Sequence, residues 1–391
     1  MMQELSTIAE VKNINADSPF TRPIKDWKEQ GRKVVAFQCN YVPGEIIWAA
    51  GALPIRITGD FYREMELGDA DSYLYITTCS FCRSCLQLAL IGKYDFLDGY
   101  ISSATCDGSR RLADIWGQYI GHIPLIHTLT VPRKMTAEAH QLYCLEIKGL
   151  KDKLEEHFKV RITQESLWDA IKLFNKTREL LLKLYETRKA DRPSISGAET
   201  MELLNAGFRM PRDKYNGLLE RLLDELQSTN RRVNGSVRLM ISGSPLNNPE
   251  FIRAIEEQGA LVVIDELCMG TSYWLDPIDT SHPDPLEAIS YRYLNKFPCA
   301  RMVPYDNRFN KIFELVREYR VDGMIAQLIR HCAPYSHDQP LLREKLEAMG
   351  IPVLELDVEY GMGGSGQIKT RIQAFLEILM GKKSNERKGT L

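Results

Sequence analysis

The sequence predicts an α/β protein in which two similar parallel-sheet domains flank a helical segment. Near both ends of the chain, short apolar stretches of strand length alternate with helix-like stretches, which is typical of parallel sheets. Between them, residues 137–229 have the apolar periodicity of helices. A chain of 391 residues is also too long for one ordinary core. We therefore expect three parts, residues 1–136, 137–235 and 236–391, with a Rossmann-like fold in the first and last.

The first domain begins with polar, helical residues and continues with strands and helices in alternation. Pro43 begins a helix that Gly51 ends, the usual placement of proline inside a helix start and glycine past its end. A second helix follows Cys79 and ends at Gly92. The predicted strands cover residues 33–39, 53–57, 73–77, 96–102 and 123–127, and a further helix covers residues 110–119.

The middle segment is expected to be helical throughout, with a break at Asp191–Gly197. One apolar face of a long helix is formed by Leu167, Ile171, Phe174, Leu181 and Tyr185. The charged residues between them are most simply its solvated face. We assign no chemistry to this segment.

The last domain resumes the α/β alternation after a polar linker at residues 230–235. The predicted strands cover residues 237–241, 261–264, 321–328 and 351–356, with a helix from Pro249 and a final helix through Leu379. The glycine-rich stretch 361–366 lacks the spacing of a dinucleotide-binding loop. It indicates a plain turn or a contact with a nucleotide-like part of a substrate.

Two short patterns occur in both domains. Asp98-Gly99 leads through an apolar strand to Cys106, and Asp322-Gly323 leads through another to Cys332. Gly51-Ala-Leu-Pro-Ile is similarly matched by Gly350-Ile-Pro-Val-Leu. These likenesses suggest two related domains that face each other.

Composition and charge exclude several classes of function. The formal net charge is -2, without the basic stripe that tracks a phosphate backbone, so we expect no nucleic-acid partner. No apolar run is long enough to cross a bilayer, and the polar N-terminus does not resemble a signal peptide. We expect a cytoplasmic protein without a membrane partner. Its nine cysteines are then more typical of thiols or metal ligands than of disulfides.

The positions of the cysteines favour soft-metal chemistry, with iron–sulfur as the leading candidate. Cys79 is expected at a helix N-terminus, where the helix field favours a thiolate. Cys106 and Cys332 lie in loops between a strand and a helix, and we predict all three as ligands. Weaker candidate ligands, also near predicted strand ends or loops, are Cys39, Cys268 and Cys299.

Ligands in open parallel sheets lie outside the carboxyl ends of the strands, so thiols at five such ends are expected to meet in one cleft. Cys82 and Cys85 continue the spacing that surrounds a cubane in bacterial ferredoxins, yet their apolar neighbours also fit a core. Three thiolates would leave one iron of a cubane open, four would close it, and six would hold two cubanes. The sequence leaves these alternatives open.

Two further residues are candidates for proton transfer. Glu45 heads a helix beside Cys39, although an acidic residue in a first helical turn also complements the helix dipole. His331 precedes Cys332, and a buried histidine bonded to the backbone is the simpler interpretation.

The chain resembles the 2-hydroxyacyl-CoA dehydratase and benzoyl-CoA reductase family over nearly its whole length, with the motifs in the same order. The first motifs are Cys39-Asn-Tyr-Val-Pro-Gly-Glu-Ile-Ile, Ala49-Ala-Gly-Ala-Leu-Pro, Cys79-Ser-Phe, Asp95-Phe-Leu-Asp-Gly, Thr105-Cys-Asp and Arg111-Leu-Ala-Asp-Ile-Trp116. The later ones are Leu267-Cys-Met-Gly, Asp284-Pro-Leu-Glu-Ala-Ile, Asp322-Gly with His331-Cys332, and Gly366-Gln-Ile-Lys-Thr-Arg371. The spacer of 26 residues between Cys79 and Cys106 is most similar to that in the smaller, cluster-bearing C-type subunit of ATP-dependent benzoyl-CoA reductase.

The resemblance implies a [4Fe-4S] cluster held by Cys79, Cys106 and Cys332 near an acyl-CoA site. It also implies a heterodimer with a related cluster-bearing subunit, and a separate ATP-hydrolysing iron–sulfur activator that supplies single electrons at low potential. The absence of a P-loop motif from this sequence is consistent with such an activator.

Alternatives within the resemblance are a 2-hydroxyacyl-CoA dehydratase subunit, which would eliminate water from its substrate, and an electron-transfer subunit with a closed cluster. Another alternative is a reductase with a double-cubane [8Fe-9S] cluster, which Cys39, Cys268 and Cys299 would help to hold. Cys82 and Cys85 depart from the family pattern and leave the ligand set open.

Overall fold

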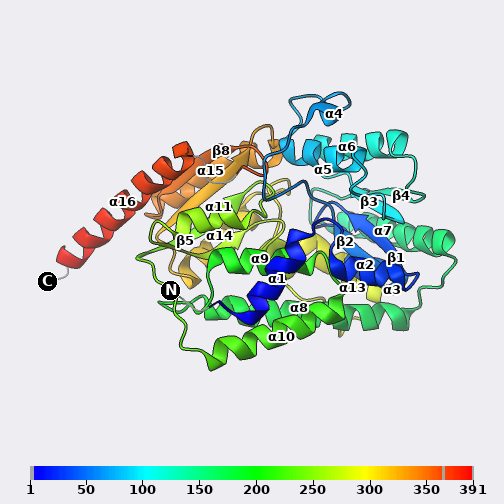
Figure 1. Ribbon diagram of the computed structural model, residues 1–391, viewed down its shortest axis with the longest axis horizontal. Coiled ribbons are helices and arrows are strands. Elements are labelled where there is room, and N and C mark those ends of the chain that lie inside the picture. The colour runs from blue at the N-terminus through cyan, green and yellow to red at the C-terminus, as the bar shows by residue number, and fades with distance from the viewer. Residues whose placement is uncertain (1–3, 363–365, 390–391) are drawn as a thin grey trace.

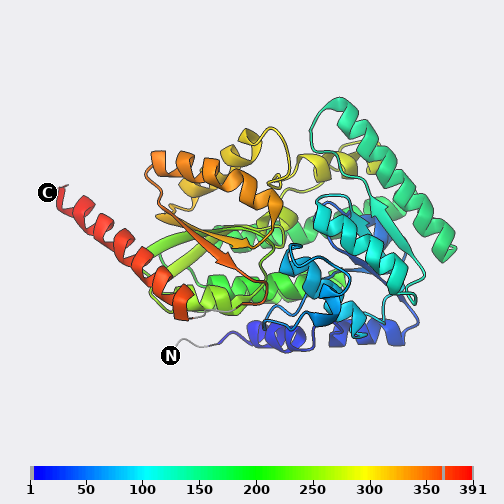
Figure 2. The same ribbon diagram turned by 90° about the horizontal axis from the view of Figure 1, so that it is seen from above.

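The computed structural model describes residues 4–362 and 366–389, with side chains described through residue 383. It has two four-stranded parallel sheets, which lie side by side with helices around them (Figure 1). The view from above shows the same separation of the two sheets (Figure 2). The predicted α/β class with two Rossmann-like sheets is confirmed.

The first sheet has the strand order β2-β1-β3-β4. The four strands are β1 (Lys33–Phe37), β2 (Ala52–Arg56), β3 (Gly99–Ser103) and β4 (Ile126–Leu129). The crossovers contain α3 (Gly44–Ala49), the short α4 (Gly68–Asp71), α5 (Ser80–Leu90) and α6 (Asp107–Tyr119). Each of β2 and β3 is buried along its whole length, as expected for parallel strands covered on both faces.

The second sheet has the order β6-β5-β7-β8. Its strands are β5 (Val237–Gly243), β6 (Ala260–Glu266), β7 (Gly323–Ile329) and β8 (Val353–Val358). Its helices are α11 (Pro249–Glu256), α12 (Thr271–Trp274), α13 (Pro285–Asn295), α14 (Asp306–Glu318), α15 (Ala333–Ala348) and α16 (Gly366–Gly389).

Both sheets have the same topology, because each places its first strand between its second and third. One contact recurs in both. The Asp98 carboxylate accepts a hydrogen bond from the Val34 N–H of β1 (2.9 Å), and the Asp322 carboxylate accepts one from the Arg238 N–H of β5 (2.7 Å). The Asp-Gly likeness therefore marks equivalent strands. The likeness of Gly51 to Gly350 does not, because Gly51 precedes β2 whereas Gly350 precedes β8, on the opposite edge of its sheet.

The helices before and between the sheets join the two halves. They are α1 (Ser6–Ala16), α2 (Arg22–Glu29), α7 (Ala137–Phe158), α8 (Gln164–Thr187), α9 (Gly197–Gly207) and α10 (Arg212–Ser228). Helix α8 packs against α3 from the first half and α13 from the second, and α9 packs against β6. The proposed domain bounds at residues 136 and 235 stay a prediction.

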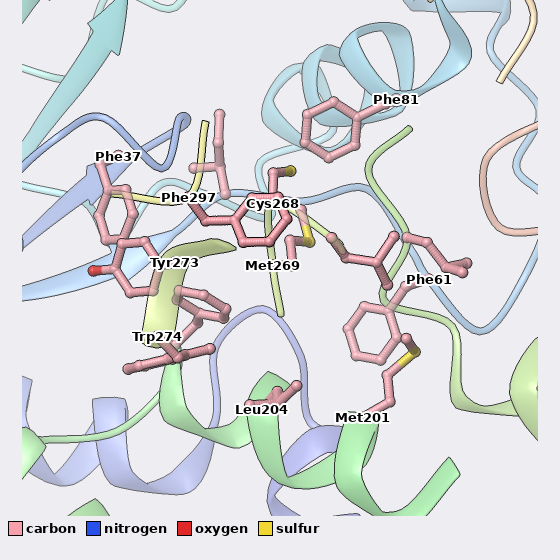
Figure 3. Close-up of a cluster of buried hydrophobic side chains, with 14 of the residues drawn as sticks. Phe37, Phe61, Phe81, Met201, Leu204, Cys268, Met269, Tyr273, Trp274 and Phe297 are labelled. Atoms are coloured by element: carbon pink, nitrogen blue, oxygen red, sulfur yellow. The ribbon is translucent and has the colours of Figure 1, made fainter. Parts of the chain in front are cut away.

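Buried aromatic side chains from separate parts of the chain connect these layers. Phe37 of β1 stacks on Tyr273 of α12 with ring centroids 5.9 Å apart, and Phe208, after α9, packs on Trp274 at 4.7 Å. Figure 3 shows Phe37, Tyr273 and Trp274 of this cluster, and near them Cys268 and Phe297. The two sheets therefore share one continuous core.

Three predicted elements differ from the structure. No strand forms at residues 73–77, where Tyr73, Tyr75 and Ile76 are exposed and the backbone turns. The alternating apolar residues that predicted this strand belong to a segment on the surface. The strand predicted at 123–127 lies at Ile126–Leu129, and the last helix continues from Leu379 to Gly389. The middle of the glycine-rich stretch, residues 363–365, lies outside the described residues.

Candidate functional site

A cavity of about 630 Å³ lies between the carboxyl ends of the two sheets. In the first sheet it is lined by residues 38–40 after β1, Arg56 at the end of β2 and residues 105–109 after β3. In the second sheet it is lined by Pro245 after β5, Cys268 after β6 and residues 331–335 after β7. The cavity thus lies at the switch point of each sheet, where open parallel sheets bind ligands.

Seven of the nine cysteines line this cavity, and they come from both halves of the chain: Cys39, Cys79, Cys82, Cys106, Cys268, Cys299 and Cys332. The six predicted ligands are all among them. Four of the six follow a strand, whereas Cys79 follows the turn at residues 73–78 and Cys299 lies in a loop after α13. Cys85 is fully buried, and neither it nor Cys144 lines the cavity.

Three of these cysteines immediately precede a helix. Cys79, Cys106 and Cys332 are the N-terminal cap residues of α5, α6 and α15. The Cys106 sulfur accepts a hydrogen bond from the Ser109 N–H (3.4 Å). Because the N-terminal end of a helix carries a partial positive charge, all three positions favour a thiolate.

The thiols differ in acidity because their surroundings differ. A hydrogen bond with the Cys82 thiol lowers the pKa of Cys79 despite burial, and the same bond raises the pKa of Cys82. Burial raises the pKa of Cys106 to about 12 and that of Cys299 to about 11, and it also raises the pKa of Cys332. Metal coordination would be needed to hold most of these sulfurs as thiolates at neutral pH.

The chemistry of the donor set, thiols that line one cavity, fits an iron–sulfur cluster. Within residues 4–362 and 366–389, no three Cys, His, Asp or Glu side chains are close enough together to hold one metal ion. A cluster is different, because each iron takes its own thiolate and the sulfurs stand apart around the cluster. Soft thiols lining a cavity of ligand-site size fit such a group.

The sequence did not identify three buried basic side chains around this cavity. Arg56 and Arg301 line it, and Lys296 lies behind Tyr41 with its Nζ 4.3 Å from the ring centroid. Arg301 donates hydrogen bonds to the carbonyl oxygens of Thr105 (2.9 Å) and Val131 (2.8 Å), and so ties the Cys106 loop to the second half. The position of Arg56 at the end of a predicted strand was the only available signal.

The two candidates for proton transfer lie in different environments. Glu45 is fully buried, does not line the cavity, and pairs with Arg178 and accepts a hydrogen bond from the Tyr293 hydroxyl (2.8 Å). Burial raises its pKa, but Arg178 and Arg292 outweigh burial and hold the pKa below its usual value. His331 lines the cavity with an exposed side chain and a φ of 66°, so it is not a buried core histidine.

One rim of the cavity is aromatic. Tyr73 and Tyr75 line it, with exposed fractions of 43% and 81%, and the Tyr73 ring lies 4.7 Å from that of Tyr119.

Among the residues that the structure describes, no helix has both the length and the hydrophobicity needed to cross a bilayer.

The family model and the individual relatives that match this chain all belong to one group of enzyme subunits. The family described as 2-hydroxyglutaryl-CoA dehydratase, D-component, matches residues 39–379. The C-type subunit of benzoyl-CoA reductase of Thauera aromatica is 26% identical over 390 residues, covering 96% of this chain and 98% of that protein. The beta subunit of (R)-2-hydroxyglutaryl-CoA dehydratase of Acidaminococcus fermentans is 25% identical, covering 95% and 98%.

A third relative, the (R)-phenyllactyl-CoA dehydratase beta subunit of Clostridium sporogenes, is 23% identical and covers 93% of this chain and 96% of its own. The family match spans most of the chain, and these relatives are similar to it from end to end. The chain belongs to the family of 2-hydroxyacyl-CoA dehydratase and benzoyl-CoA reductase subunits.

Proposed function

We propose that this chain is an iron–sulfur subunit of an ATP-dependent, activator-coupled acyl-CoA reductase of the benzoyl-CoA type. It would pass single low-potential electrons to a CoA thioester. The observation that carries the proposal is the cavity that thiols from both sheets share. Iron–sulfur potentials extend down to about −700 mV, so electrons of the required energy are chemically available.

Cys79, Cys106 and Cys332 are the first candidates to hold a [4Fe-4S] cluster. Their shared position at helix N-termini supports this assignment, because the helix field stabilises thiolates and the negative charge of a cluster. The bound cluster would supply one-electron chemistry.

A double-cubane [8Fe-9S] cluster is the second candidate, and a specific observation favours it. Cys39, Cys268 and Cys299 interact electrostatically with one another and line the same cavity as the first three cysteines. Two groups of three thiols on one cavity would provide three ligands for each of two neighbouring cubanes.

The chain's own residues would position the substrate and supply a proton. His331, at an exposed edge of the cavity, is our candidate proton donor. Glu45 could donate a proton only if it left its ion pair with Arg178 and reached the cavity. The exposed Tyr73 and Tyr75 would contact the acyl-CoA where it enters.

The proposal includes two protein partners. The relatives are named as subunits of reductases and dehydratases, so we expect a related subunit that completes a heterodimer. ATP hydrolysis would belong to a separate iron–sulfur activator. We expect this assembly in the cytoplasm, where thiols stay reduced.

Iron and acid-labile sulfide, counted after anaerobic purification, test the metal part of the proposal. We expect both in the wild-type chain, together with a low-temperature electron paramagnetic resonance signal after reduction. The combined variant C79A/C106A/C332A should lose most of the iron, whereas C144A, outside the cavity, should keep it. A wild-type chain without iron, or a triple variant with unchanged iron, would contradict the proposal.

Turnover tests the reaction, because the relatives include both reductases and dehydratases. With activator and ATP, a reductase should consume ATP with every benzoyl-CoA converted. A 2-hydroxyacyl-CoA dehydratase, the alternative lyase, should need ATP only to start and should act on 2-hydroxyglutaryl- or lactoyl-CoA. Sustained dehydration after ATP is removed would favour the lyase.

A further inference from the structure

Arg56 is a buried cation in direct contact with a cavity cysteine. It ends β2 with 4% of its surface exposed, and its Nη2 lies 3.1 Å from the Sγ of Cys268. Its Nε donates to the Gln38 carbonyl oxygen (3.0 Å), and Nη1 donates to the Cys268 carbonyl oxygen. Arg56 thus holds both the loop after β1 and the loop after β6.

The charge of Arg56 has no carboxylate counterpart. Within the described part of the chain, no Asp or Glu forms an ion pair with Arg56, and the same is true of Arg301 and Lys296. All three are buried. Buried charges in proteins are normally paired, because an unpaired one carries a large desolvation penalty.

Some other buried arginines in this chain pair with carboxylates. Arg178 pairs with Glu45, Arg231 with Glu199, and Arg308 with Glu266 and Asp338. Within the described residues, others are buried without an ion pair and away from the cavity: Arg188, Arg209, Arg212, Arg238 and Arg292. The lack of a carboxylate therefore does not by itself distinguish Arg56. What distinguishes Arg56 is its contact with a thiol that lines the cavity, because its Nη2 donates to the Cys268 sulfur.

We propose that Arg56 is a positioning residue for an anionic, thiolate-ligated centre on the Cys268 side of the cavity. Its guanidinium donates a hydrogen bond to the Cys268 sulfur, and Arg301, which also lines the cavity, supplies further positive charge. The inference rests on the proposed iron–sulfur function, in the form in which Cys268, Cys39 and Cys299 hold part of the metal centre, and adds the role of Arg56.

The arrangement affects the reduction potential. Adding an electron makes a thiolate-ligated cluster more negative, so a nearby cation and a hydrogen bond to a ligand sulfur stabilise the reduced state. Arg56 should therefore raise the potential of the centre and make it easier to reduce.

The test is an anaerobic redox titration of the full iron-loaded chain, followed by electron paramagnetic resonance. We expect R56Q to shift the potential to more negative values, with at least a tenfold loss in the ratio of reduced to oxidised centre, ~59 mV for one electron. R56K keeps the charge but loses the planar fork, so it should shift less.

R238Q is the matched control. Arg238 is also buried and donates to the carbonyl oxygens of Tyr319, Ala190 and Arg188, but it does not line the cavity. It should lose stability without moving the potential. In a C268A background, R56Q should cause a smaller further shift, because the hydrogen bond to the sulfur is already gone and only the effect of the charge remains.

The possible results separate this inference from the proposed function. A wild-type potential in R56Q with normal iron content overturns the role of Arg56 and leaves the iron–sulfur function standing. If R56Q does not fold, an unshifted potential in R56K has the same meaning. A wild-type chain that takes up no iron overturns both.

Discussion

At the scale of single residues, the cysteines show how strongly the surroundings decide what one side chain can do. Cys79, Cys82 and Cys85 lie within seven residues of sequence, yet Cys79 caps α5, Cys82 hydrogen-bonds to it in the cavity, and Cys85 faces the core. Even spacing suggested one shared role. On the helix, this spacing points the three side chains in different directions, and only Cys79 and Cys82 line the cavity.

Glu45 and Arg178 provide a residue-scale prediction. Their side chains are 0% and 4% exposed, so removing one partner leaves the other charge buried and unpaired. We expect R178A to lower the free energy of unfolding by about 3–5 kcal/mol. Urea denaturation would measure the loss.

K183A is the control for that measurement. Lys183 pairs with Glu179 on the surface, where both side chains are more than half exposed. Its loss should change stability by less than about 1 kcal/mol. Equal effects of the two variants would show that the buried pair does not stabilise the fold.

At the scale of elements, the crossovers of the second sheet carry a charged network beneath the site. Arg308 of α14 donates to both oxygens of Glu266 at the end of β6 (3.0 and 2.8 Å) and to Asp338 of α15 (2.6 Å). One guanidinium thus serves two buried carboxylates. The network links the helix that begins at Cys332 to the strand that precedes Cys268, and so couples the positions of two cavity loops.

This network predicts a pH dependence. Burial raises the pKa of Asp338 from 3.8 to about 6, with Arg308 acting in the opposite direction and Glu266 adding to the rise. Because the folded-state pKa is the higher one, Asp338 binds its proton more tightly in the folded chain. Its stabilising contribution is therefore present below pH 3.8 and is lost as the pH rises through about 6.

We expect the wild type to lose of order 3 kcal/mol relative to D338N between pH 4 and pH 7, from the pKa difference alone. Urea unfolding of both proteins at the two pH values would measure this. D338N has no proton to lose, so it serves as the reference. A constant difference between the two proteins across this range would contradict the assignment.

Gly243, where β5 ends, gives a second element-scale prediction. Its φ is 125°, and a Cβ built there would lie 1.9 Å from the Gln327 carbonyl oxygen of the neighbouring β7. G243A should destabilise the fold by more than about 1 kcal/mol, because both the backbone conformation and the space exclude a side chain. G149A, on the solvent-accessible part of α7 with open space around it, should not. Thermal unfolding of both variants would compare them, and similar melting temperatures would refute the prediction.

At the scale of the whole molecule, two sheets of one topology face each other across the cavity, and the helices between them pack against both halves. Thiols from each half therefore reach one site only when the complete chain has folded. A metal centre bound there would cross-link the halves, so metal binding and global stability should be coupled.

Metal removal tests this coupling. Chelation of the anaerobically purified chain should lower its stability to unfolding, by about 4 kcal/mol if the metal had been present at a thousand times its Kd. Unfolding followed by circular dichroism would detect the change in Tm. C144A should respond like the wild type, and the combined variant C79A/C106A/C332A should be insensitive to chelator. An unchanged Tm in the wild type would argue against a centre shared by both halves.

The sequence by itself determined the α/β class, the alternation of most strands and helices, and six of the seven cysteines that line the cavity. Local patterns are sufficient for these features, because apolar periodicity and glycine or proline signals act over a few residues. The same local signals misled at residues 73–77, where an alternating pattern belongs to an exposed turn beside the cavity.

Only the tertiary structure decided which side chains share one space. Glu45 and Arg178 are 133 positions apart, and Arg56 and Cys268 are 212 apart. No local pattern records such distances. The packing of two sheets with their carboxyl ends together buries Glu45 in an ion pair away from the cavity. The same packing brings Arg56 and Arg301 to the cavity thiols, with no carboxylate partner for either among the residues that the structure describes.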